Sequence, residues 1–170
     1  MKQTETKLRT VNPATETILN EYDIMTKEQI DAKVKTSRTA FSEWRNDIDK
    51  RVDFLYSFAN ELRKNLENLA KTATHEMGKA IKESRSEVEK CAWAIEYFAD
   101  NGKIFASDEV INTDARKSII TLEPLGVIGS IMPWNFPYWQ ALRFAAPSLM
   151  AGNTIVLKPA SATMQCGIEI

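Results

Sequence analysis

The sequence contains little of what metal-binding and disulfide-stabilised proteins require. Its 170 residues include one histidine, His75, and two cysteines, Cys91 and Cys166. A single histidine with no cluster of cysteines beside it does not form a metal site, so we expect no metal. Two cysteines do not make a disulfide framework, and we expect both thiols to be packed inside helices.

An excess of charge of one sign and a long apolar run are also missing. The 22 basic and 23 acidic residues give a net charge of -1. Without a basic surface we expect no nucleic-acid partner and no anionic lipid partner. No apolar run approaches the roughly 18 residues that a membrane span needs, and the N-terminal segment MKQTETKLRT has no apolar signal core. We therefore predict a cytoplasmic protein with no membrane partner.

The first part of the chain predicts a hairpin followed by a helix. Residues 8–22 carry β-prone edges around Asn12-Pro13-Ala14-Thr15, which is a turn signal. Thr26 and Gln29 then have the spacing of a capping box, in which each residue satisfies a backbone amide at the start of a helix. Apolar residues at helical spacing extend this predicted helix over 27–44.

Two further helices are expected before the sequence changes to β-prone segments. Apolar residues recur at helical spacing over 50–74, and again from Gly78 to about residue 100. The later helix carries a charge-rich stretch, which we interpret as a solvated helix face and not as a docking surface. Its charged residues are Lys82, Glu83, Arg85, Glu87, Glu89 and Lys90.

The last third of the chain has the pattern of a βαβ unit. A β-prone segment at 117–123 precedes two apolar strands, at 127–132 and 154–157, and a helix at 137–149 separates these two strands. Strands joined by such a helix pair in parallel, with a right-handed crossover. Residues 163–170 fit the start of another helix. The predicted fold class is therefore α/β, with an N-terminal helical layer followed by the first strands of a parallel sheet.

Polar residues follow both apolar strands. In open parallel sheets ligands bind beyond the carboxyl ends of the strands, so Pro133-Trp134-Asn135 and the segment from Lys158 to Ser161 are expected on one rim. The Lys158 ammonium suits ribose hydroxyls or a phosphate, although a lysine here also fits a plain surface position at a strand end. The Asn135 amide suits a developing oxyanion, although an asparagine before a helix is also a common N-cap.

The stretch from Glu123 to Ser161 resembles the cofactor-binding half of the NAD(P)-dependent aldehyde dehydrogenases. Its most specific parts are PWNFP and AGNTIVLKPAS, and the similarity begins at VNPAT and continues through EMGK. The resemblance is closest to the succinate-semialdehyde dehydrogenase branch. It implies a Rossmann-like sheet, a small-molecule aldehyde substrate, and oxidation of that aldehyde to the acid with NADP or NAD. In this family a cysteine thiolate attacks the aldehyde.

The resemblance also assigns roles to residues of this chain. Asn135 would be the catalytic residue, because its side chain helps to hold the oxyanion. Many NAD-preferring relatives carry a glutamate where this chain has Ser161; a neutral serine leaves room for the 2′-phosphate of NADP, and it also fits as a cap of the following helix. The implied cofactor-binding residues are Ile131, Met132, Pro133, Trp134, Lys158, Pro159, Ala160 and Ser161.

Arg143 is the clearest indication of substrate. It lies eight residues after Asn135, on a predicted helix that is otherwise apolar and aromatic. In the succinate-semialdehyde dehydrogenase branch an arginine at this offset grips the acid end of the substrate, with Phe136 beside the same path. The alternatives are a solvent-exposed arginine, or one that is paired with an acid of this chain.

The resemblance further implies that much of the catalytic machinery lies elsewhere. Cys166 follows Gln165 directly, unlike the spacing of the family's nucleophile motif, so we do not assign it as the nucleophile. We expect 1–170 to be the N-terminal part of the NAD(P)-binding domain, with the catalytic domain absent and the chain alone inactive. Residues 112–123 would be a strand for oligomer contacts in a full-length homo-oligomer. The alternative is a non-catalytic remnant, or an accessory module that binds a nucleotide or a partner.

Overall fold

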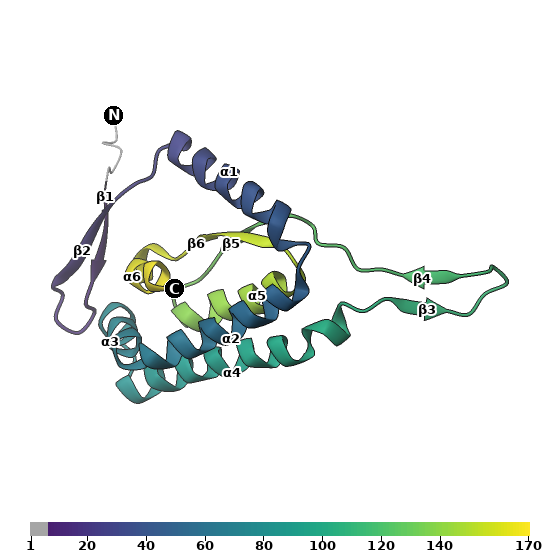
Figure 1. Cartoon of the computed structure of the whole chain (residues 1–170). Helices are drawn as coiled ribbons and strands as arrows, with labels where there is room; N and C mark the ends of the chain where they lie inside the picture. Colours follow the sequence, from purple (N-terminus) through teal and green to yellow (C-terminus); the bar gives the residue numbers. More distant parts are fainter. Residues whose placement is uncertain (1–6) are drawn as a thin grey trace.

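The computed structural model describes residues 7–170. Residues 1–6, the start of the polar segment in which no signal core is expected, lie outside the described residues. In chain order (Figure 1) the elements are β1 (Lys7–Val11), β2 (Ile18–Asp23), α1 (Lys27–Trp44), α2 (Ile48–Lys64), α3 (Leu66–Met77), α4 (Ile81–Phe105), β3 (Glu109–Ile111), β4 (Ser118–Ile120), β5 (Val127–Ile131), α5 (Pro137–Met150), β6 (Thr154–Lys158), the 3₁₀ turn η1 (Ser161–Thr163) and α6 (Met164–Glu169).

The core lies where the apolar faces of α2, α3 and α4 meet α5 and α6. Gly102 allows α4 to approach α5 closely, because a Cβ at this position would lie 2.3 Å from Cγ of Met150. The predicted apolar stripes of the second and third helices are confirmed as the buried faces of these elements. The largest fully buried apolar side chains include Leu55, Val88, Cys91, Ile95, Tyr138 and Cys166.

Two predicted helix boundaries were wrong. The single helix expected over 50–74 is two helices, because the chain leaves helical geometry at Asn65, which is the C-cap of α2 and the N-cap of α3. The Asn65 side chain and the Asn65 backbone amide both donate to the Glu61 carbonyl, at 2.9 Å and 3.1 Å. The third helix passes residue 100 and ends at Phe105, since Gly102 is a packing position against Met150 and not a stop.

The strands β5 and β6 pair in parallel, as predicted, with α1 on one side of the pair and α5 on the other (Figure 1). Their register places Ile131 opposite Lys158, and the Met132 amide donates to the Lys158 carbonyl at 3.1 Å. The strands are only partly buried: Ser130 and Thr154 are covered, whereas Ile131 is exposed. The helix α1, which covers one side of the pair, likewise contains no buried residue.

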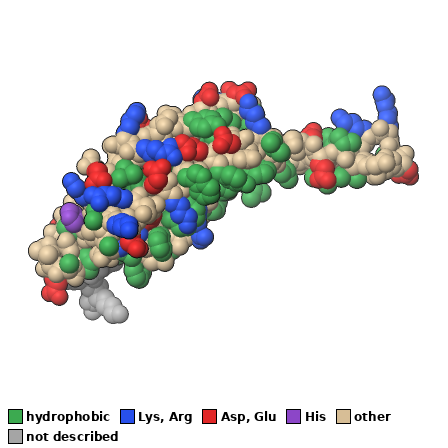
Figure 2. Space-filling model, turned by 90° about the horizontal axis from the view of Figure 1, so that it is seen from below, with side chains coloured by type: hydrophobic (Ala, Val, Ile, Leu, Met, Phe, Trp, Pro, Cys, Tyr) green, Lys and Arg blue, Asp and Glu red, His purple; other side chains and the backbone are tan. Residues whose placement is uncertain are grey.

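Two antiparallel hairpins flank the helices and the parallel strand pair. The hairpin predicted over 8–22 is confirmed as β1 and β2, and the capping box of Thr26 and Gln29 opens α1. The second hairpin, β3 with β4, forms an arm that projects from the body (Figure 1). Its first strand begins at Glu109, before the predicted segment 112–123. Hydrophobic side chains gather on the face seen from below and reach the base of this arm (Figure 2).

Three charged residues of the described helices are buried, and the contacts of two of them are as follows. Arg51 donates to the carbonyls of Trp44 and Arg45 at the end of α1 and of Met150 at the end of α5, each at 3.0 Å. Burial lowers the pKa of Arg51, and the charge of Asp47 opposes this shift. The Glu76 carboxylate accepts the amides of Gln165 and Cys166 at the start of α6, each at 3.0 Å. The third, Glu87, belongs to the site described below.

Both thiols are fully buried, as predicted. Burial raises the pKa of Cys91 and of Cys166 above the usual range for a thiol, and the nearby charges of Glu87 and Glu76 act in the same direction. No helix in the described part of the chain has both the length and the apolar character of a membrane span.

We predict that neither thiol of the folded chain reacts with a disulfide reagent such as Ellman's reagent at pH 8. A raised pKa keeps each thiol protonated at this pH, and the thiolate is the reactive form. The number of modified thiols per chain should be near zero in buffer and should reach both cysteines in guanidinium chloride. Rapid modification of either cysteine before unfolding would contradict the burial described above.

Candidate functional site

The structure brings the two predicted polar segments together on one rim. The loop after β5 and the turn after β6 leave the sheet side by side, because Ile131 and Lys158 are partners in the ladder. On the β6 side, Pro159 packs directly against α6, since a Cβ at Gly167 would lie 2.3 Å from Cβ of Pro159. The rim therefore presents Ile131 to Trp134 beside Lys158 to Ser161.

Lys158 and Ser161 are both exposed on this rim. Lys158 makes no ion pair with the other described residues. The interpretation of Ser161 as a helix cap was wrong: Ala160 is the N-cap of η1, Thr163 is the N-cap of α6, and neither helix start has a side-chain cap. The ammonium and the hydroxyl therefore remain available for a ligand at the rim.

Asn135 is half-buried, and its Oδ1 atom is buried without a hydrogen-bond partner among the described residues. The interpretation of Asn135 as an N-cap was also wrong, because the N-cap of α5 is Phe136 and no side chain caps this helix from that position. The amide is thus not used to hold the helix together. A buried carbonyl oxygen without a donor is costly in a folded protein, so the Asn135 side chain marks a position where another group is expected to bind.

A cavity of about 520 Å³ lies beside Asn135, between α4 and the first turns of α5. It is lined by Lys82, Glu83, Ser86, Glu87, Lys90, Asn135, Phe136, Trp139 and Gln140. The ammonium of Lys90 lies 4.0 Å from the centre of the Trp139 ring, a cation–π contact. The cavity therefore combines an amide, aromatic rings and charges of both signs.

Glu87 overturns the interpretation of the charge-rich stretch as a wholly solvated helix face. Its side chain is 1% exposed and forms an ion pair with Lys79, whose side chain is 8% exposed. Its Oε1 atom accepts the amides of Tyr138 at 2.9 Å and Trp139 at 2.8 Å. The sequence carried a signal for this burial, since Glu87 directly precedes Val88 and lies four residues before Cys91 on the apolar stripe of α4.

The structure does not place Arg143 in this cavity. Arg143 lies on the same helix as Trp139 and Gln140, but it is exposed and is not among the lining residues. It forms no ion pair with an acid of the described chain, which excludes that alternative within residues 7–170. Phe136, in contrast, lines the cavity directly after Asn135.

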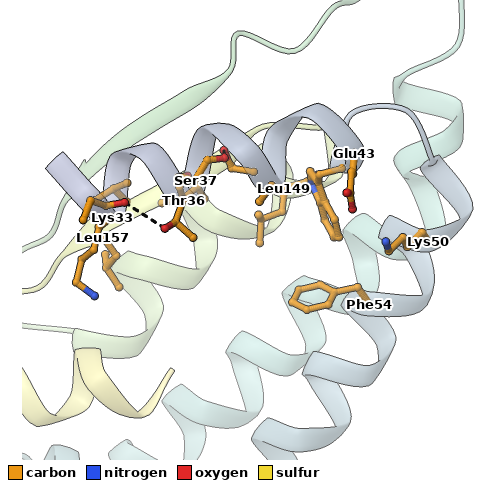
Figure 3. Close-up of a pocket in the computed structure, with 14 residues that line it drawn as sticks. Lys33, Thr36, Ser37, Glu43, Lys50, Phe54, Leu149 and Leu157 are labelled. Carbon is orange, nitrogen blue, oxygen red and sulfur yellow. Dashed lines mark hydrogen bonds between the residues drawn. The ribbon is translucent and has the colours of Figure 1, made fainter. Parts of the chain in front are cut away.

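A second cavity, of about 770 Å³, does not contain these residues. It lies between α1, the start of α2 and β6, with Thr36 and Ser37 on one side and Lys50 and Phe54 on the other (Figure 3). No group of three or more metal-ligating side chains occurs among residues 7–170. The candidate site consists of the rim and the cavity beside Asn135, because the predicted polar residues Asn135, Lys158 and Ser161 lie there.

Proteins of known sequence resemble the chain over nearly its whole length. A protein from Synechocystis named "Probable succinate-semialdehyde dehydrogenase [NADP(+)]" is 40% identical over 164 residues, which cover 96% of this chain and 36% of the relative. "Succinate-semialdehyde dehydrogenase [NADP(+)] 1" from Mycobacterium tuberculosis is 36% identical over 167 residues, with the same two coverages. The chain thus spans about a third of the length of these relatives.

Solved structures agree with the sequence matches. A succinic semialdehyde dehydrogenase from Streptococcus pyogenes in complex with NADP+ superposes with a TM-score of 0.92 at 31% identity, over 95% of this chain and 36% of that chain. An NADP-dependent glyceraldehyde-3-phosphate dehydrogenase from Bacillus halodurans, complexed with NADP, gives a TM-score of 0.89 at 29% identity, over 97% of this chain and 36% of that chain.

The family model described as "Aldehyde dehydrogenase family" matches residues 1–170. The fold, the two strand ends on one rim and the segments PWNFP and AGNTIVLKPAS agree with this match. The chain belongs to the aldehyde dehydrogenase family.

Proposed function

We propose that this chain is the N-terminal, cofactor-binding part of an enzyme that oxidises succinate semialdehyde to the acid with NADP. The observation that carries the proposal is the position of Asn135, which lines the cavity between α4 and α5 and is not used as the cap of α5. The names of the similar proteins from Synechocystis and Mycobacterium tuberculosis support this substrate and this cofactor.

Asn135 would donate its side-chain N–H to the oxygen that becomes negative when a nucleophile attacks the aldehyde. A donor that is already in place stabilises this charge with little reorganisation. The nucleophile would come from a part of the enzyme outside this sequence, because both thiols here are buried and burial raises the pKa of each.

The rim residues fit NADP. The exposed Lys158 ammonium and the neutral Ser161 hydroxyl, which is not engaged as a cap, together suit ribose oxygens and a 2′-phosphate. Ile131, Met132, Pro133, Trp134, Pro159 and Ala160 would line the rest of the cofactor. The cofactor, when bound, accepts the hydride that the oxidation releases.

Arg143 would anchor the carboxylate of the substrate, with Phe136 lining its path. The support is an exposed guanidinium that has no acidic partner among the described residues, on the helix that follows Asn135.

The arm of β3 and β4 would contribute to contacts between subunits of a homo-oligomer. Its support is a set of exposed apolar side chains on and after the arm, among them Val110, Ile120 and Leu122.

The proposal is tested by expressing the complete reading frame that contains this sequence and measuring NADPH formation with succinate semialdehyde. We expect activity in the parent protein and a decrease in kcat of about 100- to 1000-fold in Asn135→Ala, since an oxyanion donor is lost. A parent protein that binds NADP but never oxidises an aldehyde would favour the alternative of a non-catalytic nucleotide-binding module.

We predict that Ser161→Glu shifts the preference of the complete enzyme from NADP towards NAD. The carboxylate would repel the 2′-phosphate, so the ratio of kcat/KM for NADP to that for NAD should decrease by about tenfold or more. Ser57→Glu, which places the same charge on an exposed position of α2, is the matched control and should leave the ratio unchanged. An unchanged ratio in both variants would exclude Ser161 from the phosphate site.

We also predict that Arg143→Leu raises KM for succinate semialdehyde by about tenfold to a hundredfold, because a charge-assisted hydrogen bond to the substrate is lost. KM for an uncharged aldehyde of similar length should change by less than about twofold. Arg38→Leu, on the exposed face of α1, controls for the loss of a surface arginine. Equal increases in KM for both aldehydes would remove the anchor role.

A further inference from the structure

The start of α5 is held by a buried ion pair that comes from another part of the chain. Glu87 of α4 and Lys79, two residues before α4, form this pair, and both side chains are almost fully covered. Removing water from two charges is costly, and such a pair is stable only when the remaining oxygens and protons are also satisfied. The other contacts of Glu87 and Lys79 therefore show which part of the structure the pair holds in place.

The Glu87 carboxylate takes the role that an N-cap residue has in most helices. Pro137 is the first residue of α5 and has no amide hydrogen, and the N-cap residue Phe136 provides no side-chain acceptor. Oε1 of Glu87 accepts the next two amides, those of Tyr138 and Trp139. A carboxylate at this position is also favoured by the positive end of the helix dipole.

The other half of the pair contacts the residue beside Asn135. The Lys79 ammonium lies 4.4 Å from the centre of the Phe136 ring, as a cation–π contact. Lys79 thus contacts the ring of Phe136, and the backbone of Phe136 leads directly into the capped helix α5. Since Oδ1 of Asn135 has no partner, the direction of the Asn135 amide depends on its backbone neighbours and not on a bond of its own.

We propose that Lys79 and Glu87 are positioning residues that aim the Asn135 amide into the cavity between α4 and α5. This inference rests on the proposed function, since it assigns a task to Asn135 only if that amide holds an oxyanion. Glu87 acts through the helix start and not on the substrate, because both of its oxygens are engaged, one by Lys79 and one by the two amides. Displacing a catalytic group by about 1 Å can cost about a hundredfold in rate.

The chain offers a matched control in Glu76. This carboxylate is also buried and accepts two amides at the start of a helix, but the helix is α6 and the contacts are Gln165 and Cys166. Glu76→Gln and Glu87→Gln therefore both remove a carboxylate charge that caps a helix, but Glu87→Gln also leaves Lys79 without its partner, which the double variant below controls for. Only the second change lies next to the Asn135 loop.

The kinetic test compares these variants in the complete enzyme, with concentrations corrected for active sites. We expect Glu87→Gln to lower kcat by about tenfold to a hundredfold, with KM for NADP within about twofold. Glu76→Gln should leave kcat within about threefold. Equal decreases in kcat in both variants would overturn the proposal, because a general loss of stability would then explain them.

The kcat of a double variant gives a second test of the Lys79–Glu87 pair, which loss of stability alone would not explain. Lys79→Met leaves the Glu87 charge buried without a partner, whereas the double variant Lys79→Met/Glu87→Gln removes both charges and keeps an amide oxygen as acceptor. We expect the double variant to have a kcat above that of Lys79→Met, since coupled residues are not additive. Simple multiplication of the two single effects would argue against the pair acting as a unit.

A measurement without turnover separates this proposal from the proposed function. The side-chain NH₂ signals of Asn135, assigned by their loss in Asn135→Ala, are followed by nuclear magnetic resonance in the same protein. We expect them to shift or broaden in Glu87→Gln and to stay in place in Glu76→Gln. If the parent protein oxidises no aldehyde, the proposed function fails, and unchanged Asn135 signals in Glu87→Gln would overturn the positioning role independently.

Discussion

Three charged residues of the described helices, Arg51, Glu76 and Glu87, are buried, and each one contacts the end of a helix other than its own. The signs are matched to the helix dipole: the cation meets carbonyls at carboxyl ends, and the anions meet amides at amino ends. Desolvation of a charge is costly, and helix ends supply unsatisfied groups that offset this cost. The relative placement of the helices, and hence of the site, depends on these contacts.

The candidate site follows from this arrangement together with the parallel strand pair. The pair brings Lys158 and the loop after β5 to one rim, while Glu87 fixes the point at which that loop becomes α5. Asn135 lies between these two constraints. The amide is therefore supported from α4 on one side and from the sheet on the other, which suits a donor that must act without rearranging.

The sequence predicted most elements whose signals are local. The capping box at Thr26, the proline that opens α5 and the alternation of strands and helix placed the hairpin, α1 and the βαβ unit close to their observed bounds. The break at Asn65 was missed, because the apolar residues keep their helical spacing across it. The role of Glu87 was also missed. It depends on a partner 51 residues away, which no local pattern reveals.

The helix α5 is held by side-chain contacts at both of its ends. Glu87 holds its first amides and Arg51 holds its last carbonyl, while Gly102 of α4 packs against Met150 in its final turn. Fraying, the usual route by which helix amides reach solvent, is therefore blocked at both ends. Amide hydrogens of α5 should exchange only when the whole layer opens, whereas those of the projecting β3–β4 arm exchange through local openings. The loop that carries Asn135 thus leads into a helix that is held at both of its ends.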